Sequence, residues 1–183
     1  MITPEAPKVW LRRRDGRRVL GTPLRLTLAF LVLVLAAHLL LFDIRPVRGH
    51  SMAPILKEGQ WVLIFKPAYV LSAPDYGQLV VCTFPGQRDL WIKRVLGRPG
   101  DMLRAQGGLV YRNGQPLAES YLFRTNTPDF PMLKAWDGQY LLLGDNRAES
   151  VDSRDPSLGA VPDDLLTGRA VLVIWPPSAW RTL

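Results

Sequence analysis

The longest hydrophobic stretch of the chain lies near its N-terminus. Residues 26–42 read LTLAFLVLVLAAHLLLF, and none of these positions carries a formal charge. A helix of this length covers roughly 26 Å at about 1.5 Å per residue, which is close to the thickness of the hydrocarbon core of a bilayer. The pattern therefore predicts one transmembrane helix over residues 26–42.

After this segment the apolar residues follow the pattern of short β-strands separated by Gly, Pro, Asn and Asp. The predicted strands cover residues 61–65, 79–84, 90–96, 109–112, 140–143 and 169–175. Pro85-Gly86 lies between the second and third of these segments, and Asn113-Gly114 lies between YR and QPL. Together they predict two hairpins, the second with a type I′ turn. Residues 120–137 contain Pro128 and Pro131 and predict a surface loop. The rest of the chain is therefore expected to be mainly β.

The positive charge of the chain is concentrated before the hydrophobic stretch. The formal net charge is +7, but residues 1–25 alone hold seven Lys and Arg against two acidic residues. This local distribution argues against nucleic acid as a partner, because a binding groove would spread its basic residues over the folded domain. It instead predicts a cytoplasmic N-terminus and a domain on the other side of the membrane.

The chain is thus expected to divide into a basic cytoplasmic segment at 1–25, a transmembrane anchor at 26–42 and an extracytoplasmic β-rich catalytic domain at 43–183. A cleaved secretory signal is the alternative interpretation of the N-terminal pattern. The basic region is long for such a signal, its apolar core exceeds the usual length, and no Ala-x-Ala site follows Phe42. An uncleaved anchor is therefore favoured.

Cysteine and histidine are scarce. Cys82 is the single cysteine, and His38 and His50 are the two histidines. No intramolecular disulfide can form, and a zinc site built from Cys and His lacks ligands. His38 lies within the predicted anchor and is not expected to take part in catalysis.

Ser51 is the first candidate nucleophile, because GHSMA at 49–53 approximates the G-x-S-x-G elbow of α/β-hydrolases. Those enzymes need a histidine after the serine, but the sequence has none after His50. Neighbouring residues of an extended segment point to opposite faces, so His50 is a poor base for Ser51. If Ser51 is a nucleophile, its base must be another group, and a neutral lysine can fill this role.

Lys93 is the best placed of the five lysines, because it alone lies within an apolar strand segment, LWIKRVL. On a strand it shares a face with Trp91 and Val95, which would remove water from its amine and favour the neutral form. The pKa must fall by roughly three units from about 10.4 for free amine to be abundant near neutrality. The alternative is a lysine at a strand edge whose amine reaches the solvent.

Three segments together resemble, in order, the signature boxes of the bacterial type I signal peptidases, which are membrane-anchored Ser/Lys proteases of the S26 type. They are GHSMAPIL at 49–56, KRVLGRPGD at 93–101 and GDNRAESVDSR at 144–154. The N-terminal anchor, the strand after the first box and WPP near the end add to the resemblance. It implies a signal-peptidase-like antiparallel β-sheet catalytic domain behind one transmembrane helix.

The resemblance assigns roles by position. It makes Ser51 the nucleophile and Lys93 the general base, in agreement with the elimination above. Ser150 matches a hydroxyl placed against the lysine, and Asp152 and Arg154 match a pair that supports the site. Whether Gly144-Asp145-Asn146-Arg147 does more than form a turn is left open.

The oxyanion is expected to be held by the backbone N–H of Ser51 and a second donor. Some family members use a serine two positions before the nucleophile, but Gly49 stands there, so the second donor is unknown. Ile55 replaces a threonine that is common in the family. Residues 155–158 lengthen the loop between Arg154 and Gly159. The extra domain of larger relatives is expected to be reduced to the Asn113-Gly114 hairpin and the loop at 120–137.

The implied activity is the removal of N-terminal signal peptides from exported preproteins that carry small side chains at −1 and −3. The implied enzyme is a serine endopeptidase of the cytoplasmic membrane without a metal or other cofactor. The lipid bilayer is the second expected partner, and Trp61 and Phe65 are candidates for contact with it, with core packing as the alternative. Three alternative functions are a self-cleaving repressor-type protease, a pilus or conjugation processing peptidase, and a membrane-tethered module that only binds peptides. The anchor argues against the first.

Overall fold

The computed structural model describes residues 21–70, 72–122 and 126–183, so most of the predicted segment 1–25 lies outside the described residues. The chain separates into two compact units, residues 1–38 and residues 39–183. The first described element is helix α1, Gly21–Leu41. It begins five residues before the predicted span and ends one residue earlier, because Phe42 already belongs to a strand.

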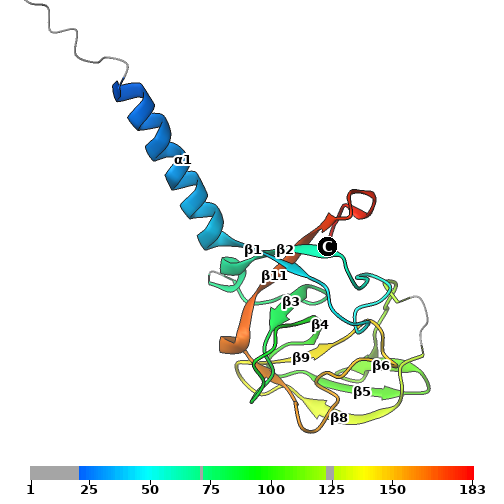
Figure 1. Ribbon diagram of the computed structural model, residues 1–183. Coiled ribbons are helices and arrows are strands. Elements are labelled where there is room, and N and C mark those ends of the chain that lie inside the picture. Colours follow the sequence, from blue (N-terminus) through cyan, green and yellow to red (C-terminus); the bar gives the residue numbers. More distant parts are fainter. Residues whose placement is uncertain (1–20, 71, 123–125) are drawn as a thin grey trace, which may run out of the picture. The chain divides into compact units, whose positions relative to one another are not determined.

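Helix α1 is long and apolar enough to cross a membrane (Figure 1). Its leucine, valine and phenylalanine side chains are largely exposed along the helix. This is unfavourable in water, since each exposed large apolar side chain forgoes roughly 1.5–3 kcal/mol of burial. A surrounding lipid phase removes that penalty, as the predicted anchor requires.

The described residues from Phe42 onward form two antiparallel sheets. The larger sheet contains eight strands in the order β1-β2-β11-β3-β4-β9-β10, with β12 paired to β11. Its strands are β1 Phe42–Pro46, β2 Trp61–Phe65, β3 Leu79–Cys82, β4 Trp91–Gly97, β9 Gln139–Leu143, β10 Val161–Pro162, β11 Leu166–Trp175 and β12 Arg181–Thr182. Three short 3₁₀ helices cover Lys66–Tyr69, Asp163–Leu165 and Pro177–Ala179. The mainly β prediction is confirmed.

The smaller sheet has the order β7-β6-β5-β8 and is larger than the sequence predicted. Its strands are β5 Met102–Gln106, β6 Leu109–Arg112, β7 Gln115–Pro116 and β8 Phe130–Lys134. The hairpin at Asn113-Gly114 is present, with positive φ at both residues as a type I′ turn requires. The loop predicted over 120–137 is wrong in part, because β8 lies within it and pairs with β5.

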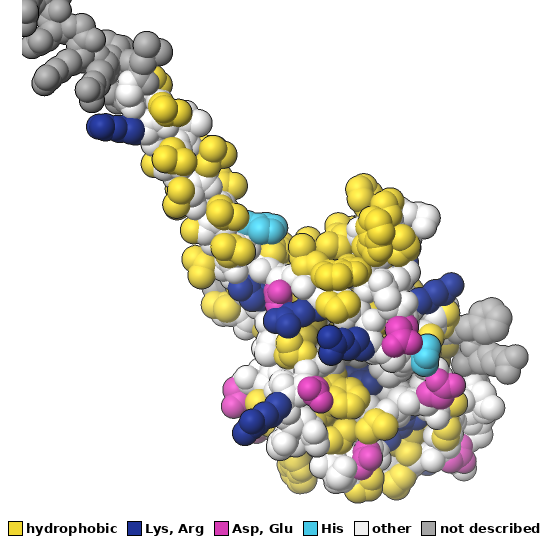
Figure 2. Space-filling view, in the orientation of Figure 1, with side chains coloured by type: hydrophobic (Ala, Val, Ile, Leu, Met, Phe, Trp, Pro, Cys, Tyr) yellow, Lys and Arg dark blue, Asp and Glu magenta, His cyan; other side chains and the backbone are white. Residues whose placement is uncertain are grey.

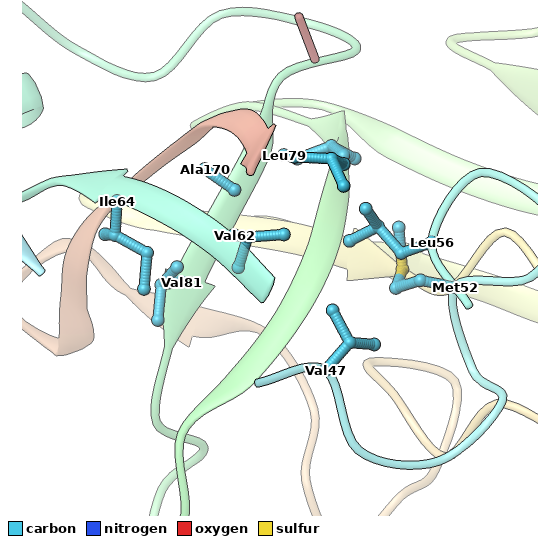
Figure 3. Packing of buried hydrophobic residues seen from close by; sticks show 9 residues of the cluster. Val47, Met52, Leu56, Val62, Ile64, Leu79, Val81 and Ala170 are labelled. Carbon is cyan, nitrogen blue, oxygen red and sulfur yellow. The ribbon is translucent and has the colours of Figure 1, made fainter. Parts of the chain in front are cut away.

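Three hydrophobic clusters hold these sheets together. One joins β4 and β9 of the larger sheet to β5, β6 and β8 of the smaller sheet, through residues such as Leu141, Leu143 and Leu103. A second lies around Phe84 and Leu142. The third packs Val47, Met52 and Leu56 against the strands of the larger sheet (Figure 3). The last cluster matters for function because Met52 and Leu56 belong to the first signature box.

Candidate active site

Lys93 lies in β4, an interior strand of the larger sheet between β3 and β9. Its backbone is opposite Val80 of β3, and its neighbour Arg94 is opposite Leu143 of β9. The Lys93 side chain is fully buried, with a relative exposure of 0%. Its Nζ lies 5.2 Å from the centre of the Trp91 ring, so the two residues share a face as the strand pattern predicted. The alternative of a solvent-reaching edge lysine is wrong.

This environment changes the ionisation of the amine. Burial lowers the pKa of Lys93 to about 8, although the carboxylate of Asp152 acts in the opposite direction. Burial acts this way because the charged ammonium loses its hydration while the neutral amine loses little. With a pKa near 8, about a tenth of the molecules carry a neutral Lys93 at pH 7. An amine of this kind can accept a proton from a nearby hydroxyl.

Ser51 lies in a compact turn between β1 and β2. The turn is closed by hydrogen bonds from Ala53 N to His50 O, 3.0 Å, and from Leu56 N to Met52 O, 2.8 Å. Met52 and Leu56 are buried in the core and anchor the turn to it (Figure 3). Ser51 itself is half-buried. The local sequence thus anchors two apolar side chains in the core and leaves the serine that precedes them half-exposed.

A second turn, residues 144–147, holds the Ser51 turn in place. The backbone N–H of Asn146 donates to the Ser51 carbonyl over 3.0 Å, and its Nδ2 donates to the His50 carbonyl over 3.2 Å. A Cβ on Gly144 would lie 2.5 Å from the Ser51 carbonyl oxygen and 2.5 Å from Ser150 Cβ. Any side chain at position 144 would clash with these two residues, so glycine is required there. The Ser51 carbonyl and the Ser150 side chain both lie against Gly144.

Ser150 connects this turn to Lys93. Lys93 Nζ donates a hydrogen bond to Ser150 Oγ over 2.9 Å, and the Ser150 N–H donates to Asn146 O over 2.9 Å. The structure therefore links Lys93 directly to Ser150, and it places the Ser150 side chain and the Ser51 carbonyl against the same residue, Gly144. Ser51, Lys93 and Ser150 are the residues that the sequence analysis selected for the site.

Asp152 is buried beside these residues and forms an ion pair with the partly buried Arg154. Arg154 Nε and NH2 donate to the two carboxylate oxygens of Asp152, each over 2.8 Å. Burial alone would raise the pKa of Asp152, but the hydrogen bonds from Arg154 and the Gly144 N–H hold it below its usual value. Arg154 also donates to the carbonyls of Arg147 and Ser150. The pair thus supports both ends of the segment 144–150.

Two further ion pairs were missed by the sequence analysis. Arg94 donates to Asp145 through Nε and NH2 over 2.7 and 2.6 Å. Arg147 donates to Glu119 over 3.0 and 2.5 Å. The turn at 144–147 was left open as a mere turn, but Asp145 and Arg147 are both buried and paired. The presence of Arg94 next to Lys93 in an apolar strand was the available signal, since buried arginines need partners.

His50 and Cys82, which the sequence analysis set aside as catalytic or metal-binding groups, have different surroundings. The His50 side chain is 65% exposed and lies 3.4 Å from Glu58, so the expectation that it is a poor base is consistent with the geometry. Cys82 is buried and free. Within the described residues, no group of three His, Cys, Asp or Glu is arranged to hold a metal ion.

The structure shows the contacts made at three positions where the sequence departs from the pattern of the resemblance. The backbone N–H of Gly49 donates to Glu58 Oε1 over 3.3 Å, so this amide is already engaged and the second oxyanion donor stays open. The Ile55 side chain packs against the core, and its carbonyl accepts a hydrogen bond from Arg181. In the lengthened loop, Asp155 accepts hydrogen bonds from Ser157 N and Oγ, and Leu158 is buried in the second cluster.

The fold is mainly β, and at its candidate site a buried lysine of lowered pKa is hydrogen-bonded to a serine hydroxyl. A neutral lysine can act as the base for a serine nucleophile, because a serine hydroxyl is a weak acid and must give up its proton as it attacks.

Comparison with known proteins shows the family to which the chain belongs. The family model of signal peptidase, peptidase S26, matches residues 21–175. A probable signal peptidase I-1 of Synechocystis sp. is 32% identical over 86% of this chain and 84% of its own length. Signal peptidase I T of Bacillus subtilis is 30% identical over 85% of both chains. The chain therefore belongs to the signal peptidase family, peptidase S26.

A crystal structure of a signal peptidase I from Enterococcus faecalis is also similar. It is 28% identical, with a TM-score of 0.48 over 54% of this chain and 97% of that chain.

Proposed function

We propose that this protein is a membrane-anchored serine endopeptidase that removes N-terminal signal peptides from exported preproteins, with Ser51 as nucleophile and Lys93 as general base. The family membership and the two relatives named signal peptidase I support the activity. The single observation that carries the assignment of residues is the buried Lys93 amine, which is hydrogen-bonded to Ser150 beside the Ser51 turn.

In the proposed reaction neutral Lys93 accepts the Ser51 hydroxyl proton while Oγ attacks the scissile carbonyl carbon. The tetrahedral intermediate then collapses: the protonated amine returns the proton to the leaving amide nitrogen, and the acyl group stays on Ser51. A water molecule gives its proton to Lys93 and attacks the ester, which releases the acid and restores the serine. Ser150 orients the Lys93 amine through both steps. The Ser51 N–H is one donor to the oxyanion.

The proposed substrates carry small side chains at −1 and −3, as the resemblance to the family implies. An extended substrate segment can pair with the backbone of a strand edge, and its alternate side chains then enter pockets on one face. The anchor confines the site to the membrane surface, where the apolar helix of a signal peptide is also held. This raises the effective concentration of the substrate at the site.

We further propose that residues 1–25 stay in the cytoplasm and that the β domain lies on the extracytoplasmic side. The support is the concentration of positive charge before α1. External protease added to right-side-out membrane vesicles should digest the β domain in intact vesicles. Protection of the β domain until the vesicles are lysed would reverse the orientation.

The lipid bilayer is the second proposed partner, and a patch of exposed apolar residues supports it. Trp61, Ile174 and Trp175 line one shallow hollow, and Trp180 donates from Nε1 to the Ile174 carbonyl beside it. We call these four residues the tryptophan patch. Figure 2 shows hydrophobic side chains gathered where β11 ends and the C-terminal segment begins. Of the two candidates from the sequence, Trp61 is exposed, whereas Phe65 packs against Phe42 at 5.4 Å between ring centres.

The activity is tested by mixing the full-length protein in detergent with a preprotein and separating the products. The parent should release the mature chain, and Ser51→Ala and Lys93→Met should abolish the reaction. Ser157→Ala and Lys134→Met are matched controls on exposed positions and should cleave at the parent rate. Cleavage that survives Ser51→Ala or Lys93→Met refutes the dyad. A parent that binds the preprotein without cleaving it would instead be a peptide-binding module.

A further inference from the structure

A short segment of the smaller sheet contacts the turn that supports Ser51. Residues 117–122, which we call the strap, follow β7 directly. The Leu117 N–H donates to Val110 O over 2.8 Å, and the Leu122 N–H donates to Glu119 O over 3.0 Å. Leu117 also packs on the cluster that joins the two sheets. The strap is therefore held by the body of the domain at its start and closed on itself at its end.

Two side chains of the strap act on two buried arginines. The Glu119 carboxylate accepts hydrogen bonds from Arg147 NH1 and NH2, over 3.0 and 2.5 Å. Tyr121 donates to Glu119 Oε1 over 2.6 Å, and its ring centre lies 3.9 Å from the guanidinium carbon of Arg94. Thr127 Oγ1 accepts a further hydrogen bond from Arg147 NH1 over 3.0 Å. The strap thus fixes the orientation of both guanidinium groups.

The same arginines hold the turn at 144–147. Arg147 Nε donates to the Gly144 carbonyl over 2.9 Å, and Arg94 binds the Asp145 carboxylate with two hydrogen bonds. Gly144 is the residue against which Ser51 and Ser150 both lie. A continuous set of charge-assisted hydrogen bonds therefore leads from Glu119 to the contact between the nucleophile turn and the partner of Lys93.

We propose that Glu119 is a positioning residue for the reaction, which orients Arg147 and thereby sets the distance between the Ser51 turn and the Ser150–Lys93 pair. This inference rests on the proposed roles of Ser51 and Lys93. The proposed role differs from a purely structural one, because the Glu119–Arg147 ion pair is connected through Gly144 to the residues proposed to react, and not only to the core. A displacement of about 1 Å in a reacting group is enough to reduce the rate by up to about a hundredfold.

Loss of the Glu119 charge should also affect the Lys93 amine. The charged and titratable groups that act on Lys93 are Asp152, Arg154, Asp145 and Cys82. Asp145 belongs to the 144–147 turn, and Arg154 donates a hydrogen bond to the carbonyl of Arg147 in that turn. If the turn loosens, water gains access to the amine, and its pKa rises toward the ordinary value because desolvation is the main cause of its depression.

The test is Glu119→Gln in the full-length protein in detergent, with cleavage of a preprotein measured from pH 6 to 10. We expect kcat to fall about tenfold to a hundredfold, KM to stay within about twofold, and the acidic limb of the profile to move upward by about one pH unit. Asp129→Asn is the matched control, since it neutralises an exposed carboxylate between the strap and β8. It should keep the parent rate and profile.

A double variant separates positioning from stability. Glu119→Gln leaves Arg147 as a buried cation without its carboxylate, which lowers the melting temperature. Adding Arg147→Met removes that charge, so the melting temperature should recover while kcat stays low and the acidic limb stays shifted. Recovery of both stability and rate would overturn the proposal. If Glu119→Gln fails to fold, Tyr121→Phe keeps the ring on Arg94 and removes one hydrogen bond to Glu119, and it should shift the limb in the same direction.

The results also separate this inference from the proposed function. If the parent cleaves only with both Ser51 and Lys93 present, while Glu119→Gln and Tyr121→Phe keep the parent kcat and pH profile, the positioning role alone is wrong. If Ser51→Ala still cleaves, the proposed mechanism fails, and the positioning role fails with it.

Discussion

Lys93 Nζ donates a hydrogen bond to Ser150 Oγ over 2.9 Å, across a separation of 57 residues in the sequence. The amine is fully buried, so this hydroxyl is one of the few polar groups that reach it. A buried ammonium is costly and a buried neutral amine is not, so the surroundings that orient Lys93 also favour its basic form. One contact therefore couples the geometry of the site to its ionisation.

The rate should depend on pH through Lys93. A general base acts only when deprotonated, and burial lowers the pKa of Lys93 to about 8. We therefore expect kcat/KM to fall tenfold per pH unit below about pH 8 and to level off above it. The measurement is a profile from pH 6 to 10 with a soluble signal-peptide substrate. A flat profile across pH 7 to 9 would contradict this assignment.

Replacing Lys93 should stabilise the protein while abolishing cleavage. The pKa of the lysine is about 10.5 when exposed and about 8 in the folded chain, so the unfolded chain binds more protons between these values. Burying the Lys93 ammonium therefore lowers the free energy of unfolding by roughly 3 kcal/mol below pH 8. This loss shrinks as the pH rises and disappears above pH 10.5. Lys93→Met should therefore raise the free energy of unfolding at pH 7 and raise it little at pH 10.5. Denaturant unfolding in detergent at the two pH values measures the difference, and an equal gain at both would disprove the depressed pKa.

Ser150→Ala should slow the reaction without preventing folding. The change removes the hydroxyl that accepts the hydrogen bond from Lys93 Nζ, so the amine loses its orientation toward Ser51. We expect kcat to fall about tenfold to a hundredfold with little change in KM, as for loss of a positioned hydrogen bond. Ser157→Ala is the control, because that exposed serine bonds only locally to Asp155. Equal rates for the two variants would remove Ser150 from the mechanism.

Gly144→Ala should be more damaging than Gly59→Ala. An added methyl at Gly144 would overlap the Ser51 carbonyl and the Ser150 side chain, which forces the two segments apart. Gly59 has open space around it but a φ of +81°, so alanine there carries only the left-handed backbone penalty of about 1–2 kcal/mol. We expect Gly59→Ala to retain cleavage and Gly144→Ala to lose at least tenfold in kcat. Activity assays and melting temperatures of both variants test this, and an active Gly144→Ala would show that the close approach is dispensable.

The tryptophan patch should contact lipid in reconstituted vesicles. Trp175 and Trp180 are 55% and 67% exposed, and an indole ring favours the interface between hydrocarbon and water. We expect brominated lipids to quench the fluorescence of both, so that Trp175→Ala and Trp180→Ala each reduce the quenched fraction. Trp136→Ala is the control, because Trp136 is 62% exposed but follows β8 of the smaller sheet. Loss of quenching only in Trp136→Ala would place the membrane contact elsewhere.

The hydrophobic pattern was sufficient to predict some strands and not others. Trp61–Phe65 and Leu109–Arg112 were predicted with their observed bounds, because each is a continuous apolar or β-branched segment between turn residues. β8 was missed because Pro131 lies within it, yet this strand is at the edge of its sheet, where proline removes no ladder hydrogen bond. β5 was missed because its alternation of buried and exposed residues extends over only five positions and begins with an exposed methionine.

The sequence by itself determined the mainly β class, the apolar helix and the choice of Ser51 and Lys93. These follow from local pattern, composition and the absence of a usable histidine, together with three boxes in a recognisable order. Only the tertiary structure decided that Lys93 is fully buried, that Ser150 meets its amine, and that Glu119 reaches Arg147. Such contacts depend on how distant strands pair and pack, and a charge in the sequence does not reveal which opposite charge will be buried against it.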